Sequence, residues 1–192
     1  MADYPRLGAL MDAAQRDGGW NKIVSYLVEV WLDDYSETTD KTDIVETSTS
    51  GFSYLFDIEA ERLLAAWGIS RGRHGEPRDK GRMAGHPKAG GGSYHRGHAI
   101  PHALGGPTDI NLVPQLGRVN IGPFRRLERE AVATPGSFYF TYWSYRGSPA
   151  VRGFPGQIPT QVDQGLLVLG RDPRISRHLN QPGETTGDST GG

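Results

Sequence analysis

The stretch Ser93–Glu130, SYHRGHAIPHALGGPTDINLVPQLGRVNIGPFRRLERE, places three histidines close together and then runs through a Gly-Gly turn into a basic segment. These histidines are His95, His98 and His102. An Arg-Gly pair and an Ile-Pro pair separate them, and because glycine weakens a helix and proline cannot continue one, a helical zinc site is not favoured. In an extended segment side chains alternate between faces, which predicts that His98 and His102 share one face while His95 points away. A zinc site built from all three histidines remains an alternative.

The rest of the same stretch predicts two short extended pieces and a helix. Residues 98–101 and 111–113 have the composition of short strands, and the Gly-Gly-Pro sequence at 105–107 predicts a turn between them. Pro123 is well placed as the first residue of a helix that ends near Ala133. The order of elements is therefore strand, turn, strand and helix.

The polar residues of this stretch suit the hydrolysis of a phosphodiester bond. That reaction needs a base, a cation that stabilises the phosphate charge and usually a divalent metal ion. Candidates occur in the order Arg96, His98, Asn120 and Glu128. On one regular helix Asn120 and Glu128 would be about 12 Å apart along the axis, too far to share one ion. A helix that begins only at Pro123 lets Asn120 fold back over its first turn.

The segments HRGHAIP, NLVPQ and NIGPFRRLERE together resemble the strand, hairpin and helix of the DNA/RNA non-specific endonucleases. These are the ββα-metal or His-Me finger nucleases, with the signature Asp-Arg-Gly-His. The resemblance covers about residues 85–131 and implies that His98 is the general base and that Arg96 supports the phosphate site. It also implies that Asn120 binds a hydrated Mg²⁺ ion, for which Mn²⁺ is an alternative. Glu128 would then act in catalysis through the water bound to that metal.

The resemblance also implies supporting residues and one departure. Asn111 and Gln115 match further positions of the family, where the asparagine helps to hold the site together. His95 stands where the family signature has aspartate. If that aspartate only braces the loop, His95 can substitute by hydrogen bonding, and if it positions a metal-bound water, the rate or the metal preference should change. Many members of the family use an additional arginine from an earlier strand. Arg82, with Arg78 as the other candidate, is assigned to that role.

Charge is distributed unevenly along the chain. Residues 1–70 contain five Lys/Arg and thirteen Asp/Glu, whereas residues 71–130 contain eleven Lys/Arg, five Asp/Glu and five of the six histidines. A basic, histidine-rich centre favours a polyanionic ligand, although charge runs are also typical of solvated faces. Three arginines of the predicted helix are interpreted as nucleic-acid contacts: Arg125, Arg126 and Arg129.

Apolar spacing and composition predict the remaining elements. Helices are expected over residues 21–33 and 57–67, a loop or short exposed hairpin over 36–50, a long loop over 70–92, and strands within 137–147 and 158–170. The aromatic residues of the first of these strands are expected in the core rather than as stacking platforms for bases. The predicted fold class is α+β, with a ββα-metal nuclease core. Three regions follow: an acidic, mostly helical N-terminal extension (1–70), the nuclease domain (71–179) and a disordered tail (180–192).

Composition excludes several classes of protein and site. With no cysteine, the chain has no disulfide, no cysteine-ligated zinc and no thiol nucleophile. It has no apolar run long enough to span a bilayer and no pattern typical of a signal peptide. We therefore expect a soluble protein that, if exported, leaves without a cleaved signal peptide. The resemblance to nucleases found in bacterial toxins further implies that it is made in the bacterial cytoplasm and then exported or injected.

The resulting hypothesis is a Mg²⁺-dependent, non-specific endonuclease of DNA, RNA or both. The family resemblance suggests an antibacterial or cell-killing toxin or effector, with an acidic immunity protein as partner and the N-terminal extension engaging a secretion or injection apparatus. Two alternatives stay open. One is a nucleic-acid-binding or adaptor protein that has lost catalytic activity, as the replacement of the signature aspartate by His95 would indicate. The other is the zinc-stabilised structural module.

Overall fold

The computed structural model describes residues 2–39, 42–75, 93–149 and 156–182. Its largest element is an antiparallel six-stranded sheet, and a separate hairpin forms a two-stranded sheet. In spatial order the large sheet contains β1 (Ile44–Thr49), β2 (Phe52–Asp57), β3 (Arg62–Ile69), β6 (Phe138–Ser144), β7 (Gln161–Leu167) and β8 (Arg174–Leu179), and the hairpin contains β4 (Tyr94–His98) and β5 (Leu112–Leu116). The helices are α1 (Leu7–Asp17), α2 (Asn21–Ser36), α3 (Gly117–Ile121), α4 (Phe124–Ala133) and the short 3₁₀ helix η3 (His102–Leu104). Within these ranges no helix has the length and apolar character needed to cross a membrane.

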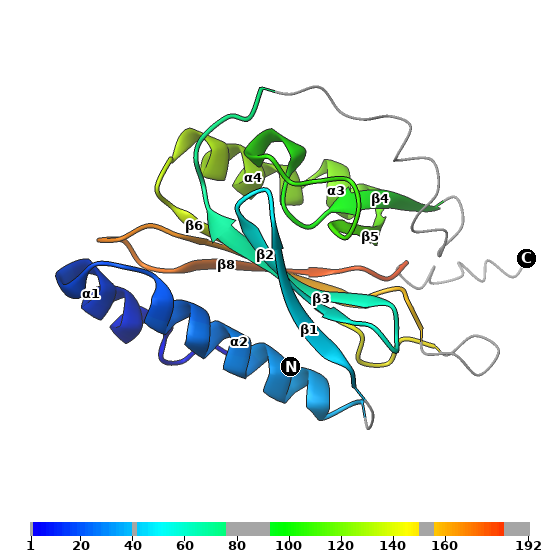
Figure 1. Ribbon diagram of the computed structural model, residues 1–192. Helices are drawn as coiled ribbons and strands as arrows, with labels where there is room; N and C mark the ends of the chain where they lie inside the picture. The colour runs from blue at the N-terminus through cyan, green and yellow to red at the C-terminus, as the bar shows by residue number, and fades with distance from the viewer. Residues whose placement is uncertain (1, 40–41, 76–92, 150–155, 183–192) are drawn as a thin grey trace, which may run out of the picture.

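Two layers of structure cover the large sheet. Helices α1 and α2 lie on one face, whereas α3, α4 and the β4–β5 hairpin lie on the other (Figure 1). Side chains of β6 alternate between these layers. Phe140 packs against Trp31 of α2, with ring centroids 5.4 Å apart, and Trp143 packs against Phe124 of α4 at 6.0 Å. Every aromatic residue from Phe138 to Tyr145 is buried, which confirms that this strand belongs to the core.

The helix predicted over residues 57–67 is wrong. These residues form the end of β2, a turn in which Glu61 has a positive φ of 51°, and most of β3. Strand β3 pairs with β2 on one side and β6 on the other, and its residues 62–67 are all buried. A strand buried on both faces has a continuous apolar run, here LLAAW, and this run cannot be distinguished from a buried helix by periodicity alone.

The N-terminal part of the chain is consequently not mostly helical. Helices α1 and α2 are followed by three strands. The exposed hairpin that was one of the two predictions for residues 36–50 is only partly correct, because the exposed strand β1 lies in that range but its partner β2 lies beyond it and is mostly buried. Because β3 pairs with β6, strands from both sides of residue 70 belong to one sheet. The predicted helix over 21–33 and the two predicted strands after residue 136 are confirmed as α2, β6 and β7.

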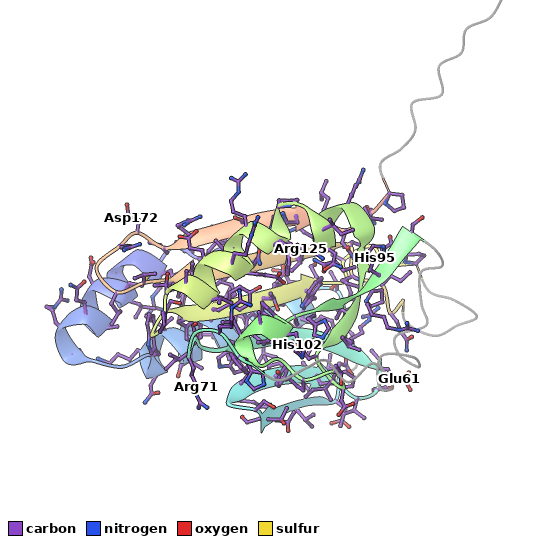
Figure 2. All side chains as sticks on the ribbon, turned by 90° about the horizontal axis from the view of Figure 1, so that it is seen from above. Glu61, Arg71, His95, His102, Arg125 and Asp172 are labelled. Atoms are coloured by element: carbon purple, nitrogen blue, oxygen red, sulfur yellow. The ribbon has the colours of Figure 1, made fainter. Side chains whose placement is uncertain are left out.

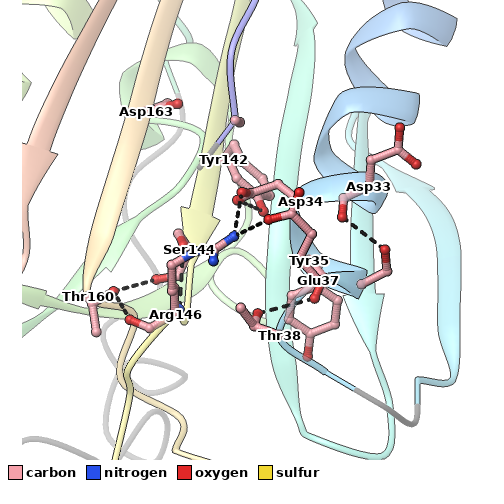
Figure 3. Close-up of polar contacts among 12 residues, drawn as sticks. Asp33, Asp34, Tyr35, Glu37, Thr38, Tyr142, Ser144, Arg146, Thr160 and Asp163 are labelled. Atoms are coloured by element: carbon pink, nitrogen blue, oxygen red, sulfur yellow. Dashed lines mark hydrogen bonds and ion pairs between the residues drawn. The ribbon is translucent and has the colours of Figure 1, made fainter.

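A cluster of polar side chains joins the C-terminal end of α2 to the end of β6 (Figure 3). Asp34 is 7% exposed and accepts a hydrogen bond of 2.8 Å from the Tyr142 hydroxyl. Arg146 pairs with Asp34 at 3.2 Å and with Glu37 at 2.6 Å. A carboxylate out of water needs such partners, because burial without them is costly. Part of the acidic charge before residue 70 therefore holds α2 on the sheet.

The C-terminal part of the chain extends the sheet further than predicted. Strand β8 was not predicted, and Asn180, assigned to the disordered tail, is fully buried. The start of that tail is therefore ordered, which corrects the boundary at 180. Residues 183–192 lie outside the described ranges. Residues 76–92 of the predicted long loop also lie outside them, and so do both Arg78 and Arg82.

Candidate active site

The β4–β5 hairpin carries the predicted base and the predicted phosphate-binding arginine. In its register His98 lies opposite Leu112 and Arg96 lies opposite Pro114. Because side chains alternate along a strand, Arg96 and His98 lie on one face of the hairpin and His95 lies on the other. His98 is 9% exposed and Arg96 is half-buried, whereas His95 is exposed. The hairpin thus separates the two histidines of the HRGH segment.

The structure brings His98 and His102 together and leaves His95 apart. The rings of His98 and His102 have centroids 6.3 Å apart and an interplanar angle of 87°. The strand predicted over residues 98–101 is wrong, because β4 ends at His98 and the chain then bends into η3, which begins at His102. The expected proximity of His98 and His102 is nevertheless correct. The His95 ring lies against Gly117 of α3, and Figure 2 shows His95 well away from His102. Within the described ranges no group of three or more His, Cys, Asp or Glu side chains can hold a metal, so the three-histidine zinc site is wrong.

Asn111 braces the turn that follows the predicted base. Its Oδ1 accepts a hydrogen bond of 2.6 Å from the Ile100 N–H, and its Nδ2 donates to the carbonyl oxygens of Ile100 and Pro107 at 2.7 and 3.0 Å. Gly106 permits this arrangement, because an added Cβ there would lie 2.0 Å from the Ile100 oxygen. Asn111 is fully buried, so its hydrogen bonds hold the residues after His98 in one conformation.

Gln115 lies fully buried against the hairpin glycine. An added Cβ on Gly97 would be 2.3 Å from the Gln115 Oε1 atom, so only glycine fits between Arg96 and His98. Among the described residues, neither Oε1 nor Nε2 of Gln115 has a hydrogen-bond partner. An unsatisfied buried polar group costs about 1–3 kcal/mol, and functional sites are one place where such groups are found. The sequence-predicted pair Asn111 and Gln115 thus flanks the His98 segment.

Asn120 lies on a helix of its own and not on the loop before α4. The short helix α3 was not predicted; it begins directly after β5 and packs against both strands of the hairpin. Gly122, with φ −92° and ψ −111°, separates α3 from α4, and Pro123 is the N-cap of α4. The predicted helix start at Pro123 is therefore confirmed to within one residue. Asn120 is half-buried.

Glu128 lies at the edge of the buried face of α4. That face is formed by Phe124, Leu127 and Ala131, and Glu128 itself is half-buried. Beneath the helix, the Gln164 Nε2 atom donates to the Phe124 carbonyl oxygen at 3.0 Å and to the Tyr139 hydroxyl at 2.8 Å. Burial raises the pKa of Tyr139 well above its ordinary value, and the negative charge of Glu128 raises it further. Glu128 is thus close enough to the interior to act on a buried group.

Asn120 and Glu128 provide the donor atoms that a hydrated magnesium ion needs. An amide carbonyl and a carboxylate are hard oxygen donors, which Mg²⁺ prefers, and Mg²⁺ usually keeps several waters. Both side chains are half-buried, so water can complete the coordination of an ion held there. Helix α3 packs against α4, which places the two donors on neighbouring helices. The chemistry of these two donors therefore suits a hydrated Mg²⁺ ion.

The three arginines predicted to contact nucleic acid are all exposed on α4. They are Arg125, Arg126 and Arg129. The Arg129 Nε atom donates to the Arg125 carbonyl oxygen at 3.3 Å, and Figure 2 shows Arg125 on the same outer side of the protein as His95. The further arginine assigned from the sequence, Arg82, lies outside the described residues.

Sequence reasoning missed three polar residues around the site. Gln164 and Asn180 are buried, and His178 is half-buried with a buried Nε2 atom. Gln164 hydrogen-bonds to Phe124, 40 positions away, and Asn180 hydrogen-bonds to Leu116, 64 positions away. No local motif can reveal such pairs, because each partner is chosen by strand order in the folded sheet.

His178 makes the stability of the fold depend on pH. Its ring packs on Phe124 of α4 at 5.7 Å, and burial lowers the pKa of His178 from its ordinary value of 6.5, although Asp163 opposes this shift. The unfolded chain then binds a proton more readily, so this contribution to stability is complete above pH 6.5 and falls as the pH drops towards the folded-state pKa. As the pH is lowered from 8 to 5, the melting temperature measured by circular dichroism should fall less steeply for His178→Gln than for wild type. Identical pH profiles would contradict this assignment.

Comparison with known proteins gives limited similarity. No protein-family model and no curated protein matches the chain. Among solved structures, the chain is similar to a chain of the "Crystal structure of the EndoG/EndoGI complex: Mechanism of EndoG inhibition". The match has 16% sequence identity and a TM-score of 0.47, and covers 71% of this chain and 74% of that chain. The function is therefore inferred from the residues themselves.

Proposed function

We propose that the chain is a Mg²⁺-dependent endonuclease that hydrolyses phosphodiester bonds of DNA, RNA or both with little sequence preference. The observation that carries the proposal is the position of His98, a buried imidazole at the end of β4. Helix α3, which carries Asn120, packs against β4, and α4, which carries Glu128, packs against η3 just after His98. A candidate base and two oxygen donors therefore belong to one layer on one side of the large sheet.

The residues of this layer have distinct roles in the proposed reaction. Neutral His98 takes a proton from the attacking water, which makes that water a better nucleophile. Arg96, on the same face of the hairpin, pairs with the phosphate through its guanidinium group. Asn120 and Glu128 would hold Mg²⁺, which supplies positive charge that stabilises the phosphate as it reacts.

Exposed arginines provide the proposed means of binding nucleic acid. Arg125, Arg126 and Arg129 lie on the exposed side of α4, which belongs to the layer that holds the candidate site. Contacts to phosphate position a nucleic acid without reading its bases, so binding through them has little sequence preference. Such binding weakens as salt concentration rises, because counterions released from the nucleic acid drive it.

We extend the proposal to a biological setting on the basis of the motif resemblance. Nuclease modules of this type are common in bacterial toxins, so the chain is proposed to be an antibacterial or cell-killing effector, which is an argument by analogy. It would act after export or injection from the producing cell. An immunity protein with an acidic surface would cover the arginines of α4 in the producing cell, and the acidic N-terminal part would engage the delivery apparatus.

Cleavage of nucleic acid tests the proposed activity directly. Purified protein incubated with supercoiled plasmid or with RNA should cut at least one substrate in Mg²⁺ or Mn²⁺ and neither in EDTA. Gel electrophoresis measures nicked, linear and fragmented products. Binding in a mobility-shift assay without any cleavage would favour the decayed nucleic-acid-binding protein instead.

A further inference from the structure

The segment that follows β8 crosses from the large sheet to the hairpin and α3. Asn180 is fully buried, its backbone N–H donates to the Thr160 carbonyl oxygen at 2.8 Å, and its own carbonyl oxygen accepts a hydrogen bond of 3.1 Å from the Tyr94 hydroxyl. The next residue, Gln181, accepts a bond of 2.8 Å from Arg118 of α3 through its carbonyl oxygen. Residues 180–181 are thus bonded to β4, to α3 and to the loop before β7.

The Asn180 side chain uses its carboxamide to connect β5 with the start of α3. Its Oδ1 accepts a hydrogen bond of 2.7 Å from the Leu116 N–H. Its Nδ2 donates to the carbonyl oxygens of Pro114 and Pro159 at 3.0 and 2.7 Å. Both hydrogens of Nδ2 are used as donors, and an ionised aspartate at this position would lack them. An apolar residue would remove the side-chain partner of all three backbone groups, the Leu116 N–H and the carbonyl oxygens of Pro114 and Pro159.

The connected backbone leads directly to Asn120. Leu116 ends β5 and is the N-cap residue of α3, and no side chain within the helix caps that end. Helix α3 has five residues, too few to be stable by its own hydrogen bonds, so its position depends on tertiary contacts. Asn120 lies one helical turn after Leu116 and therefore moves with it.

We propose that Asn180 is a positioning residue for Asn120, and that the functional unit extends to residues 180–181, beyond the motif-bearing segment. This inference rests on the proposed metal-binding role of Asn120. Outer residues that orient a metal ligand typically contribute about 10- to 100-fold to metal affinity or activity. Asn180 acts through the backbone of Leu116 and touches neither substrate nor metal.

Three variants in the full chain test this inference. Asn180→Ala removes the carboxamide. Tyr94→Phe removes only one hydrogen bond to the Asn180 backbone, so it tests the same connection if Asn180→Ala does not fold. Tyr142→Phe is the matched control, because it removes a buried hydrogen bond of 2.8 Å on the opposite face of the sheet. For each protein, Mn²⁺ binding is titrated by electron paramagnetic resonance, and kcat and KM for plasmid cleavage are measured at several Mg²⁺ concentrations.

The expected pattern separates positioning from general destabilisation. Asn180→Ala should weaken Mn²⁺ binding by about 10- to 100-fold and reduce kcat at subsaturating Mg²⁺ while KM for plasmid changes little. Tyr94→Phe should shift both quantities in the same direction by less, and Tyr142→Phe should lower the melting temperature and leave Mn²⁺ binding unchanged. If Asn180→Ala folds and binds Mn²⁺ as tightly as wild type, the positioning role of Asn180 is wrong, while the proposed function stands. If Asn180→Ala does not fold, wild-type Mn²⁺ binding by Tyr94→Phe leads to the same conclusion. A wild-type protein that neither binds Mn²⁺ nor cleaves nucleic acid overturns the proposed function as well.

Discussion

Replacing His98 with alanine should lower the rate of nucleic-acid cleavage by about 10²- to 10⁴-fold, which is the usual contribution of a general base. The reason is chemical, since the variant can no longer take the proton from the attacking water. Gel-based cleavage of plasmid at saturating Mg²⁺ measures the loss, and Mn²⁺ titration shows whether the metal site remains.

Exogenous imidazole distinguishes a lost base from a lost structural contact. Alanine at position 98 leaves a cavity of about the size of the missing ring, so added imidazole should restore part of the activity of His98→Ala. His74→Ala is the matched control, because His74 is exposed and its ring centroid lies 6.4 Å from that of His102. It should cleave at close to the wild-type rate. Wild-type activity in His98→Ala would remove His98 from the mechanism.

Replacing Asn120 with alanine should reduce cleavage by about 10²-fold or more, because charge stabilisation by a bound metal is worth several kcal/mol. The variant should also bind Mn²⁺ much more weakly than wild type. Both effects follow from the loss of the amide oxygen proposed to hold the ion. Cleavage measured over a range of Mg²⁺ concentrations and Mn²⁺ titration by electron paramagnetic resonance report them independently.

Asn120→Asp is the matched control for this substitution. It keeps an oxygen donor of the same length and adds a negative charge, so it should retain Mn²⁺ binding that Asn120→Ala loses. Folding is checked by the melting temperature, since Asn120 is only half-buried and its truncation leaves little cavity. Normal Mg²⁺ dependence of cleavage in Asn120→Ala would show that the ion binds elsewhere.

Of the two candidate metal-binding residues, the sequence correctly predicted the secondary structure of one and not of the other. Glu128 was correctly predicted to lie on a helix that begins at the Gly-Pro pair, because proline and the apolar spacing are local signals. Asn120 was expected on a loop, yet it lies on α3. Five helical residues carry no repeating apolar pattern, and their conformation depends on the hairpin and on Asn180.

Local signals alone were sufficient for several parts of this protein. Helix α2, the aromatic strand β6 and the start of α4 at the Gly-Pro pair could all be inferred from residue spacing, glycine and proline. The strand predicted over residues 98–101 overlaps β4 only at His98, and the unpredicted helix α3 lies between β5 and α4. The separation of His95 from His98 also followed from the alternation of side chains along a strand. These features depend on neighbours within a few residues, and those neighbours are visible in the sequence.

Only the tertiary structure decided the rest, because it depends on partners far apart in the chain. The segment LLAAW has the composition of a helix and becomes β3 because β2 and β6 hydrogen-bond to it on both sides. In the sequence Asn180 looks like an ordinary polar residue in a tail. In the structure, the pairing of β8 with β7 places Asn180 beside Leu116 at the start of α3. Burial on both faces and pairing across tens of residues override local preference, since together they remove more apolar surface and satisfy more backbone groups than a local helix or a solvated tail could.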